Sequence, residues 1–129
     1  MLNSILLVDD NNATNYIHEK ILVKANFVKE IKSFQMGQLA LDYLSNENNT
    51  LPDIIFVDIN MPTMDAWVFI EVYKSIKRIP KDKIKIFLLT TSLIPQDEHK
   101  ITTLGNLICG VIMKPLTKAS IQGILTQYF

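Results

Sequence analysis

The stretch Asp53-Ile-Ile-Phe-Val-Asp58, continued by Ile59-Asn-Met-Pro62, joins an apolar run directly to a carboxylate and then to a turn. A short apolar run bounded by polar and turn residues is typical of a strand that is buried on both faces. We therefore predict a strand over residues 53–57, inside a sheet that helices cover on both sides. Asp58 follows this strand and stands at its carboxyl end.

Similar apolar runs occur on either side of this stretch, and amphipathic segments with helical spacing lie between them. Strands are predicted at residues 4–8, 28–34, 53–57, 84–89 and 107–113, and helices at residues 14–25, 36–44, 65–77, 97–104 and 117–129. Gly105 is a stop signal for the fourth helix. Five alternations of strand and helix predict an α/β fold with a doubly wound parallel sheet, whose ligand site lies at the carboxyl ends of the strands.

Spacing also predicts which side chains the helices bury. The expected apolar faces are Ile17, Ile21, Leu22 and Ala25; Leu39, Ala40, Tyr43 and Leu44; Val68, Phe69, Val72 and Ile76; and Ile121, Ile124, Leu125 and Tyr128. Trp67 and the methionines are assigned to packing, and Cys109 to an inert buried thiol. His18 and His99 are expected to be exposed and away from the polar ends of the strands.

Composition restricts the class of protein. The chain has 129 residues, 48% of them hydrophobic and 20% charged, and 13 basic residues balance 13 acidic ones. This composition predicts one globular domain over residues 1–129, without the basic excess that nucleic acid binding requires. A single cysteine favours a reducing compartment, and no signal peptide or membrane span is apparent. We expect a cytoplasmic protein that binds neither nucleic acid nor membrane.

Polar residues follow four of the predicted strands: Asp9 and Asp10, Asp58, Thr90 and Lys114. Each residue alone is explained by a turn, a helix cap or a solvated charge. Together, three carboxylates at one edge of an apolar sheet repel one another unless a positive charge neutralises them. Oxygen ligands without histidine or cysteine favour Mg²⁺ (or Mn²⁺) over zinc.

A metal among carboxylates suits phosphoryl chemistry, with a hydroxyl and an ammonium holding the remaining oxygens. The sequence has no Ser-His-Asp set and no glycine-rich nucleotide loop, which leaves a carboxylate as the nucleophile. A phosphatase of the haloacid type also uses an aspartate nucleophile, but it needs a second acidic residue two positions later. Here that position is Asn60, and a cap region is missing.

The ordered strings Leu7-Val-Asp-Asp10, Asp53 to Pro62, Phe87-Leu-Leu-Thr-Thr-Ser92 and Met113-Lys-Pro115 resemble the receiver domain of two-component response regulators. The resemblance runs from Ser4 to Phe129 and is to the stand-alone type, similar to the chemotaxis response regulator, without an output domain. It implies a flavodoxin-like fold with strand order 2-1-3-4-5. It also implies a signalling domain rather than an enzyme in the ordinary sense.

By this resemblance, Asp58 is the phosphoacceptor. Asp10 and Asp58 would contact Mg²⁺ directly, Asp9 mainly through water, and Asn60 through its backbone carbonyl. The side chain of Asn60 is also implied to border the attacking water and so to tune the lifetime of the acyl phosphate. Lys114 would pair with a phosphoryl oxygen.

The resemblance assigns the residues after the fourth strand as well. Thr90 is the switch hydroxyl that bonds the phosphoryl group, and Thr91 is the small residue whose backbone N–H assists. Ser92, like Asn60, tunes the acyl phosphate. Lys114 and Pro115 match the cis Lys-Pro peptide of the family.

Two positions depart from the family pattern. Val111 stands where the switch aromatic is normally found, three residues before the lysine, so the usual coupled rotation with Thr90 cannot operate. Ala66 replaces the glycine of the loop after the phosphoacceptor, and Thr63 fills its variable position; these predict a stiffer or slightly displaced loop.

The family implies a histidine kinase or a histidine phosphotransfer protein as donor and a downstream protein target, with the chain a monomer or weak dimer. The alternative is a receiver-fold module that docks constitutively without useful phosphorylation, which Val111 favours.

Overall fold

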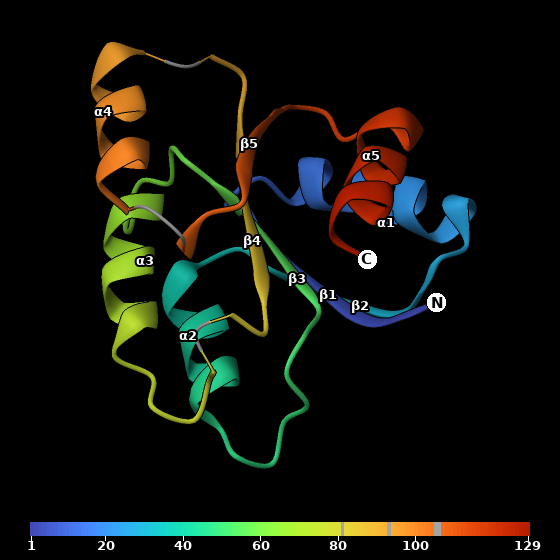
Figure 1. Ribbon diagram of the computed structural model, residues 1–129, viewed down its shortest axis with the longest axis horizontal. Helices are drawn as coiled ribbons and strands as arrows, with labels where there is room; N and C mark the ends of the chain where they lie inside the picture. The colour runs from blue at the N-terminus through green and yellow to red at the C-terminus, as the bar shows by residue number, and fades with distance from the viewer. Residues whose placement is uncertain (81, 93, 105–106) are drawn as a thin grey trace.

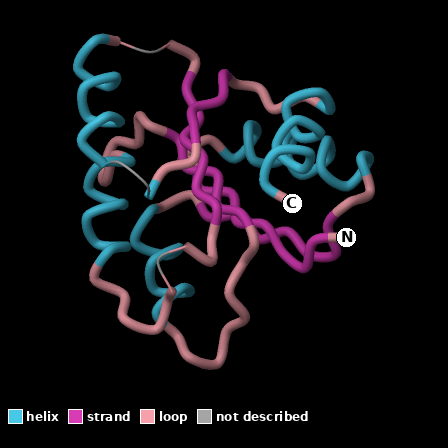
Figure 2. The backbone as a smooth tube through the Cα atoms, in the orientation of Figure 1, coloured by secondary structure: helices cyan, strands magenta, loops and turns pink. Residues whose placement is uncertain are grey.

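The computed structural model describes residues 1–80, 82–92, 94–104 and 107–129. Within these residues, strands and helices alternate along the chain (Figures 1 and 2). The strands are β1 (Leu2–Val8), β2 (Val28–Phe34), β3 (Ile54–Asp58), β4 (Lys85–Thr90) and β5 (Gly110–Met113). The helices are α1 (Asn12–Ala25), α2 (Gly37–Ser45), α3 (Ala66–Lys74), α4 (Pro95–Leu104) and α5 (Lys118–Tyr128).

The described strands form one parallel sheet in the order β2-β1-β3-β4-β5. This confirms the flavodoxin-like, doubly wound α/β fold that the sequence predicts. The order reverses between β1 and β3, so the carboxyl ends of these two strands flank the crevice where such sheets bind ligands. No helix among the described residues is both long and apolar enough to cross a membrane.

Helices cover both faces of the sheet (Figure 1), because successive residues of a buried strand point to opposite sides. On one face, Leu6, Val57 and Leu88 pack with residues of α2 and α3. On the other face, Leu7, Phe56 and Leu89 pack with Leu22 of α1 and with Ile121 and Ile124 of α5. Strands β1, β3 and β4 therefore lie within the core and fix the positions of the residues at their ends.

The structure corrects the predicted apolar faces of three helices. Ile17, Leu39 and Val68 are about half exposed, and Val72 is 38% exposed. Leu22, Ala40, Leu44 and Phe69 are buried as predicted. The buried faces also include Asn15 and His18 in α1, Gly37 and Leu41 in α2, and Ala66, Ile70 and Tyr73 in α3. The predicted and the observed faces both have helical spacing in α2 and α3, and packing against the sheet selects the observed one.

The ends of several elements also differ from the prediction. Strand β5 begins at Gly110 instead of residue 107, and α3 ends at Lys74 instead of residue 77. Helix α4 begins at Pro95, two residues before the predicted start, since proline is favoured in the first turn. Gly105, the predicted stop signal of this helix, lies outside the described residues. Cys109 precedes β5 and is partly buried.

Candidate functional site

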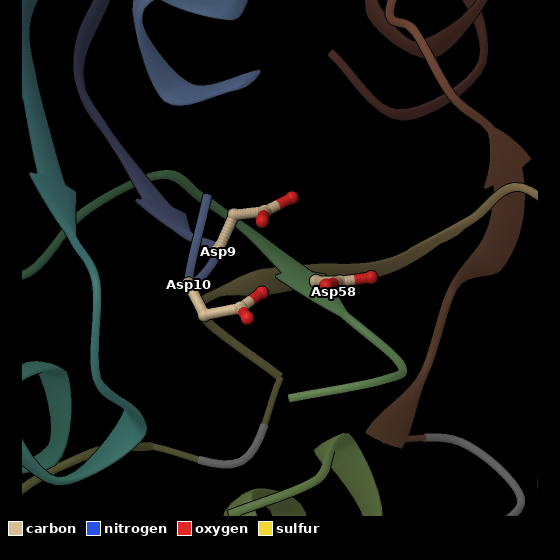
Figure 3. A group of neighbouring side chains, drawn as sticks. All are labelled: Asp9, Asp10 and Asp58. Carbon is tan, nitrogen blue, oxygen red and sulfur yellow. The ribbon is translucent and has the colours of Figure 1, made fainter. Parts of the chain in front are cut away.

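Two neighbouring strands bring three carboxylates together. Asp9 and Asp10 directly follow β1, and Asp58 is the last residue of β3. Val8 pairs with Val57 in the parallel register, so the residues that follow them emerge at the same level of the sheet. Carboxylate oxygens of Asp9, Asp10 and Asp58 lie within 4.8 Å of one another. Figure 3 shows the three side chains extending from the two strand ends into one region.

Two of these carboxylates are removed from solvent. Asp9 is 2% exposed and Asp58 is 4% exposed, whereas Asp10 is exposed. Backbone donors stabilise the buried pair, because Asn11 N–H donates to Asp9 Oδ1 at 2.9 Å and Asn60 N–H donates to Asp58 Oδ1 at 3.4 Å. Asn60 itself is exposed beside the acidic group. The buried carboxylates are therefore held in place but only partly compensated.

Lys114 provides the positive charge within this group. Its Nζ atom lies 3.0 Å from Asp9 Oδ2 and 3.0 Å from Asp58 Oδ1. The residue follows β5, its backbone N–H donates to the Thr90 carbonyl at 2.8 Å, and the Lys114–Pro115 peptide bond is cis. The lysine chain thus reaches from β5 to residues at the ends of β3 and β1.

The charges do not balance, since one ammonium faces three carboxylates. Burial raises the pKa of Asp58, and the charge of Asp9 adds to this effect, although the hydrogen bond from Lys114 opposes it. Burial alone lowers the pKa of Lys114, but its hydrogen bonds to Asp58 and Asp9 outweigh burial and raise the pKa. The lysine therefore stays charged, and the site keeps a surplus of negative charge.

This surplus suits a hard cation. The three carboxylates are closely spaced, with Asp10 exposed to solvent and Asp9 and Asp58 buried. This arrangement matches the preference of Mg²⁺ for oxygen ligands and retained waters. Asp9, Asp10 and Asp58 fit such an ion, and Asn60 stands where the resemblance places a backbone ligand. The resemblance to receiver domains implies Mg²⁺ at an acidic pocket of this kind.

The residues predicted to follow β4 lie at its carboxyl end. Thr90 is the last residue of β4, with 0% exposure, and it pairs with Met113 across the sheet. Its hydroxyl donates to the Ser92 carbonyl at 2.6 Å and accepts from the Ser92 N–H at 3.1 Å. Thr91 and Ser92 are exposed. In this conformation the Thr90 hydroxyl is engaged with its own loop.

Removing the Thr90 hydroxyl tests this local arrangement. Thr90→Val should lower the free energy of unfolding by about 1 kcal/mol, because two hydrogen bonds to Ser92 are lost at a buried position while side-chain volume is kept. Thr90→Ser retains the hydroxyl but loses a buried methyl group, so Thr90→Val against the wild type is the comparison that isolates the hydroxyl. Urea denaturation measures this difference, and a Thr90→Val variant as stable as the wild type would contradict a role for the hydroxyl.

The two positions that depart from the family pattern lie in β5 and at the start of α3. Val111 lies in β5, pairs with Leu88, and packs partly buried against the α2–α3 side of the core. Ala66 is the first residue of α3, fully buried, and its N–H donates to the Ile59 carbonyl at 3.2 Å. Thr63 is exposed.

Sequence reasoning missed two polar residues beside the site. His18 was predicted to be exposed and remote, but it is 0% exposed, and its Nε2 accepts a hydrogen bond from Leu116 N–H at 3.1 Å. Asn15 is 2% exposed, and its Nδ2 donates to the Asp9 carbonyl at 2.9 Å. Both share a helical face with Leu22, since residues i, i+3 and i+7 lie on one side of a helix. This spacing was the available signal that the two polar residues are buried.

Comparison with known proteins identifies the family. The family model of the response regulator receiver domain matches residues 5–126. The chain belongs to this family. A receiver domain is a signalling domain of two-component systems, and histidine kinases or phosphotransfer proteins are the partners of such domains.

Individual relatives agree with this assignment of a receiver domain. A probable methanogenesis regulatory protein of Methanothrix harundinacea is 31% identical over 117 residues, covering 88% of this chain and 72% of that protein. The hybrid signal transduction histidine kinase L of Dictyostelium discoideum is 29% identical over 99% of this chain, which spans 7% of that protein. The crystal structure of a two-component response regulator from Cytophaga hutchinsonii has a TM-score of 0.84 at 28% identity, covering 98% of this chain and 96% of that one.

Proposed function

We propose that this receiver domain accepts a phosphoryl group on Asp58 and thereby changes its affinity for a protein partner. The observation that carries the proposal is the geometry around Asp58: a buried carboxylate beside Asp9 and Asp10, with Lys114 Nζ 3.0 Å from its Oδ1. The donor is a histidine kinase or a histidine phosphotransfer protein, and the target is another protein. The domain acts over residues 1–129 as a cytoplasmic monomer or weak dimer.

In the transfer step, an Asp58 carboxylate oxygen attacks the phosphorus atom of a phosphohistidine. A P–O bond forms and the P–N bond breaks, and its electron pair returns to the imidazole, which leaves as the neutral ring when its other nitrogen carries a proton. Lys114 holds its charge near the phosphoryl oxygens, and Thr90 and the Thr91 N–H stand at the end of β4 to bind them. Bound Mg²⁺, held by Asp9, Asp10, Asp58 and Asn60, would neutralise charge on the phosphoryl oxygens.

Return to the resting state is a hydrolysis. Water attacks the phosphorus, the acyl phosphate P–O bond breaks, and inorganic phosphate and the Asp58 carboxylate are released. Asn60 and Ser92 are both exposed next to the site, where their side chains border the path of the water and tune the lifetime of the acyl phosphate. The chain therefore catalyses only its own phosphorylation by the donor and its own dephosphorylation.

Incubation with a small phosphodonor and Mg²⁺ tests the proposal. We expect the mass of one phosphoryl group to be added, through a bond that is stable in acid and labile in base, as an acyl phosphate is. Asp58→Ala should abolish the addition, and Asp42→Ala, at an exposed aspartate of α2, should leave it intact. An unmodified wild-type protein, or modification that survives Asp58→Ala, would overturn the assignment.

A second candidate function is constitutive docking by the receiver fold without useful phosphorylation. Val111 favours it, because an aliphatic side chain packed at this position of β5 lacks the ring that normally moves with the switch hydroxyl. Binding of the partner protein, measured before and after this incubation, separates the two candidates: the docking module predicts an affinity that phosphorylation leaves unchanged.

A further inference from the structure

We propose that His18 is a positioning residue for Lys114, acting through the backbone of the loop that joins β5 to α5. This proposal rests on the proposed function, in which Lys114 assists phosphoryl transfer to Asp58. Its basis is a buried contact between α1 and this loop: His18 Nε2 accepts a hydrogen bond from Leu116 N–H at 3.1 Å. Leu116 and His18 are both 0% exposed.

Leu116 lies two residues after Lys114, and the Lys114 N–H is itself bonded to the Thr90 carbonyl at 2.8 Å. The short segment from residue 114 to 116 is therefore fixed at one end by β4 and at the other by His18. Lys114 Nζ must reach Asp9 and Asp58 at the same time, at 3.0 Å each. A shift of the backbone at Leu116 changes where the lysine chain starts, and hence the distance to the two carboxylates.

Asn15 makes a similar contact to the backbone of Asp9, the residue that pairs with Lys114. It lies three residues before His18 on the buried face of α1, and its Nδ2 donates to the Asp9 carbonyl at 2.9 Å. Helix α1 thus bonds the strand end that carries Asp9 through Asn15 and the loop that carries Lys114 through His18. Buried polar atoms cost stability unless they are hydrogen-bonded, and these contacts satisfy Asn15 Nδ2 and His18 Nε2, whereas Asn15 Oδ1 and His18 Nδ1 have no hydrogen-bond partner among the described residues. Helix α1 therefore holds the backbone of Asp9 and the backbone near Lys114 at a fixed separation.

The environment of His18 fixes the protonation state that this role needs. Burial lowers the pKa of His18, with Lys114 acting in the same sense and Asp9 opposing it. The ring is therefore neutral at neutral pH, with Nε2 free to accept and the proton on Nδ1. His18 also lines a cavity of about 200 Å³ together with Thr14, Thr91 and Lys114, so His18 and Lys114 border the same cavity.

Two substitutions of similar size separate positioning from mere packing. In His18→Gln the amide oxygen can take the place of Nε2 and accept from Leu116 N–H, whereas in His18→Asn the side chain is too short and mimics only Nδ1. We expect the phosphorylation rate from a small phosphodonor to fall about tenfold in His18→Asn, an effect that is common when a residue that only orients a functional group is replaced. His18→Gln should stay within about threefold of wild type. Urea denaturation of both variants identifies any rate change that is due to unfolding.

A spectroscopic measurement tests the contact without depending on phosphorylation. Nitrogen-15 NMR should show His18 as the Nδ1–H tautomer, and the Leu116 amide resonance should move in His18→Asn more than in His18→Gln. Equal phosphorylation rates in two folded variants, or an Nε2–H tautomer in the wild type, overturn the proposal. A wild-type protein that takes up no phosphoryl group overturns the proposed function instead, because the tautomer and the amide shift remain measurable.

Discussion

Lys114→Met is expected to lower the free energy of unfolding by about 3 kcal/mol at neutral pH in the absence of divalent cations, because it leaves buried carboxylates without a counter-charge. Asp9 and Asp58 are 2% and 4% exposed, and each lies 3.0 Å from the lysine nitrogen. Methionine keeps most of the length and apolar volume of the lysine chain, so the loss reports on charge. Urea denaturation with a chelator present measures it.

The control for this substitution is Lys118→Met, at an exposed lysine in the first turn of α5. Its effect should stay within about 0.5 kcal/mol, as is usual for surface changes. Adding Mg²⁺ should reduce the deficit of Lys114→Met, since a cation among the carboxylates supplies part of the missing charge. The pKa of Lys114 lies above its ordinary value of 10.5, so its contribution is fully present below that value and is lost only as pH rises beyond it. A loss below 1 kcal/mol would contradict the electrostatic role.

The sequence was sufficient to predict the sheet and the acidic site, for a physical reason. Strands such as residues 54–57 are buried on both faces, so their apolar runs are continuous and easy to recognise. Parallel strands share one carboxyl edge, so residues that follow these runs must converge there. Asp9, Asp58 and Lys114 were placed together on this argument, and they lie together in the structure.

The helix faces and the buried polar contacts were less predictable. Leu39 and Leu41 both fit a helical stripe, and only packing against the sheet decides that Leu41 is buried. His18 and Asn15 are polar, and polar residues in a helix are read as exposed by default. Their burial depends on hydrogen-bond partners outside α1. The partner of His18 is the distant Leu116 N–H, and that of Asn15 is the Asp9 carbonyl six residues before it. Spacing within α1 places both residues on the face of Leu22 but cannot indicate these partners.

Replacing the phosphoacceptor should have the opposite effect on stability to replacing the lysine. Asp58→Asn is expected to raise the free energy of unfolding of the metal-free protein by about 2 kcal/mol at neutral pH, because it removes one buried negative charge from a site with too many. Asparagine preserves the shape of the side chain, and its carbonyl oxygen can still accept from Asn60 N–H and Lys114. Lys114 also keeps its pair with Asp9.

The pH dependence of this gain follows from the raised pKa of Asp58. The unfolded chain has the ordinary value of 3.8, and the folded protein holds the proton to higher pH because burial and Asp9 disfavour the carboxylate. Between these two pKa values the folded state binds more protons, so wild-type stability falls as pH rises through that window. Asp58→Asn has no such titration, and its advantage should therefore grow from near zero at about pH 4 to its full value above the folded pKa. Urea denaturation of both proteins in chelator across this range measures the trend, with Asp42→Asn as the exposed control. An advantage that shrinks with rising pH, or a destabilised Asp58→Asn, would show that Lys114 over-compensates the acidic group and that the surplus charge invoked for the cation site does not exist.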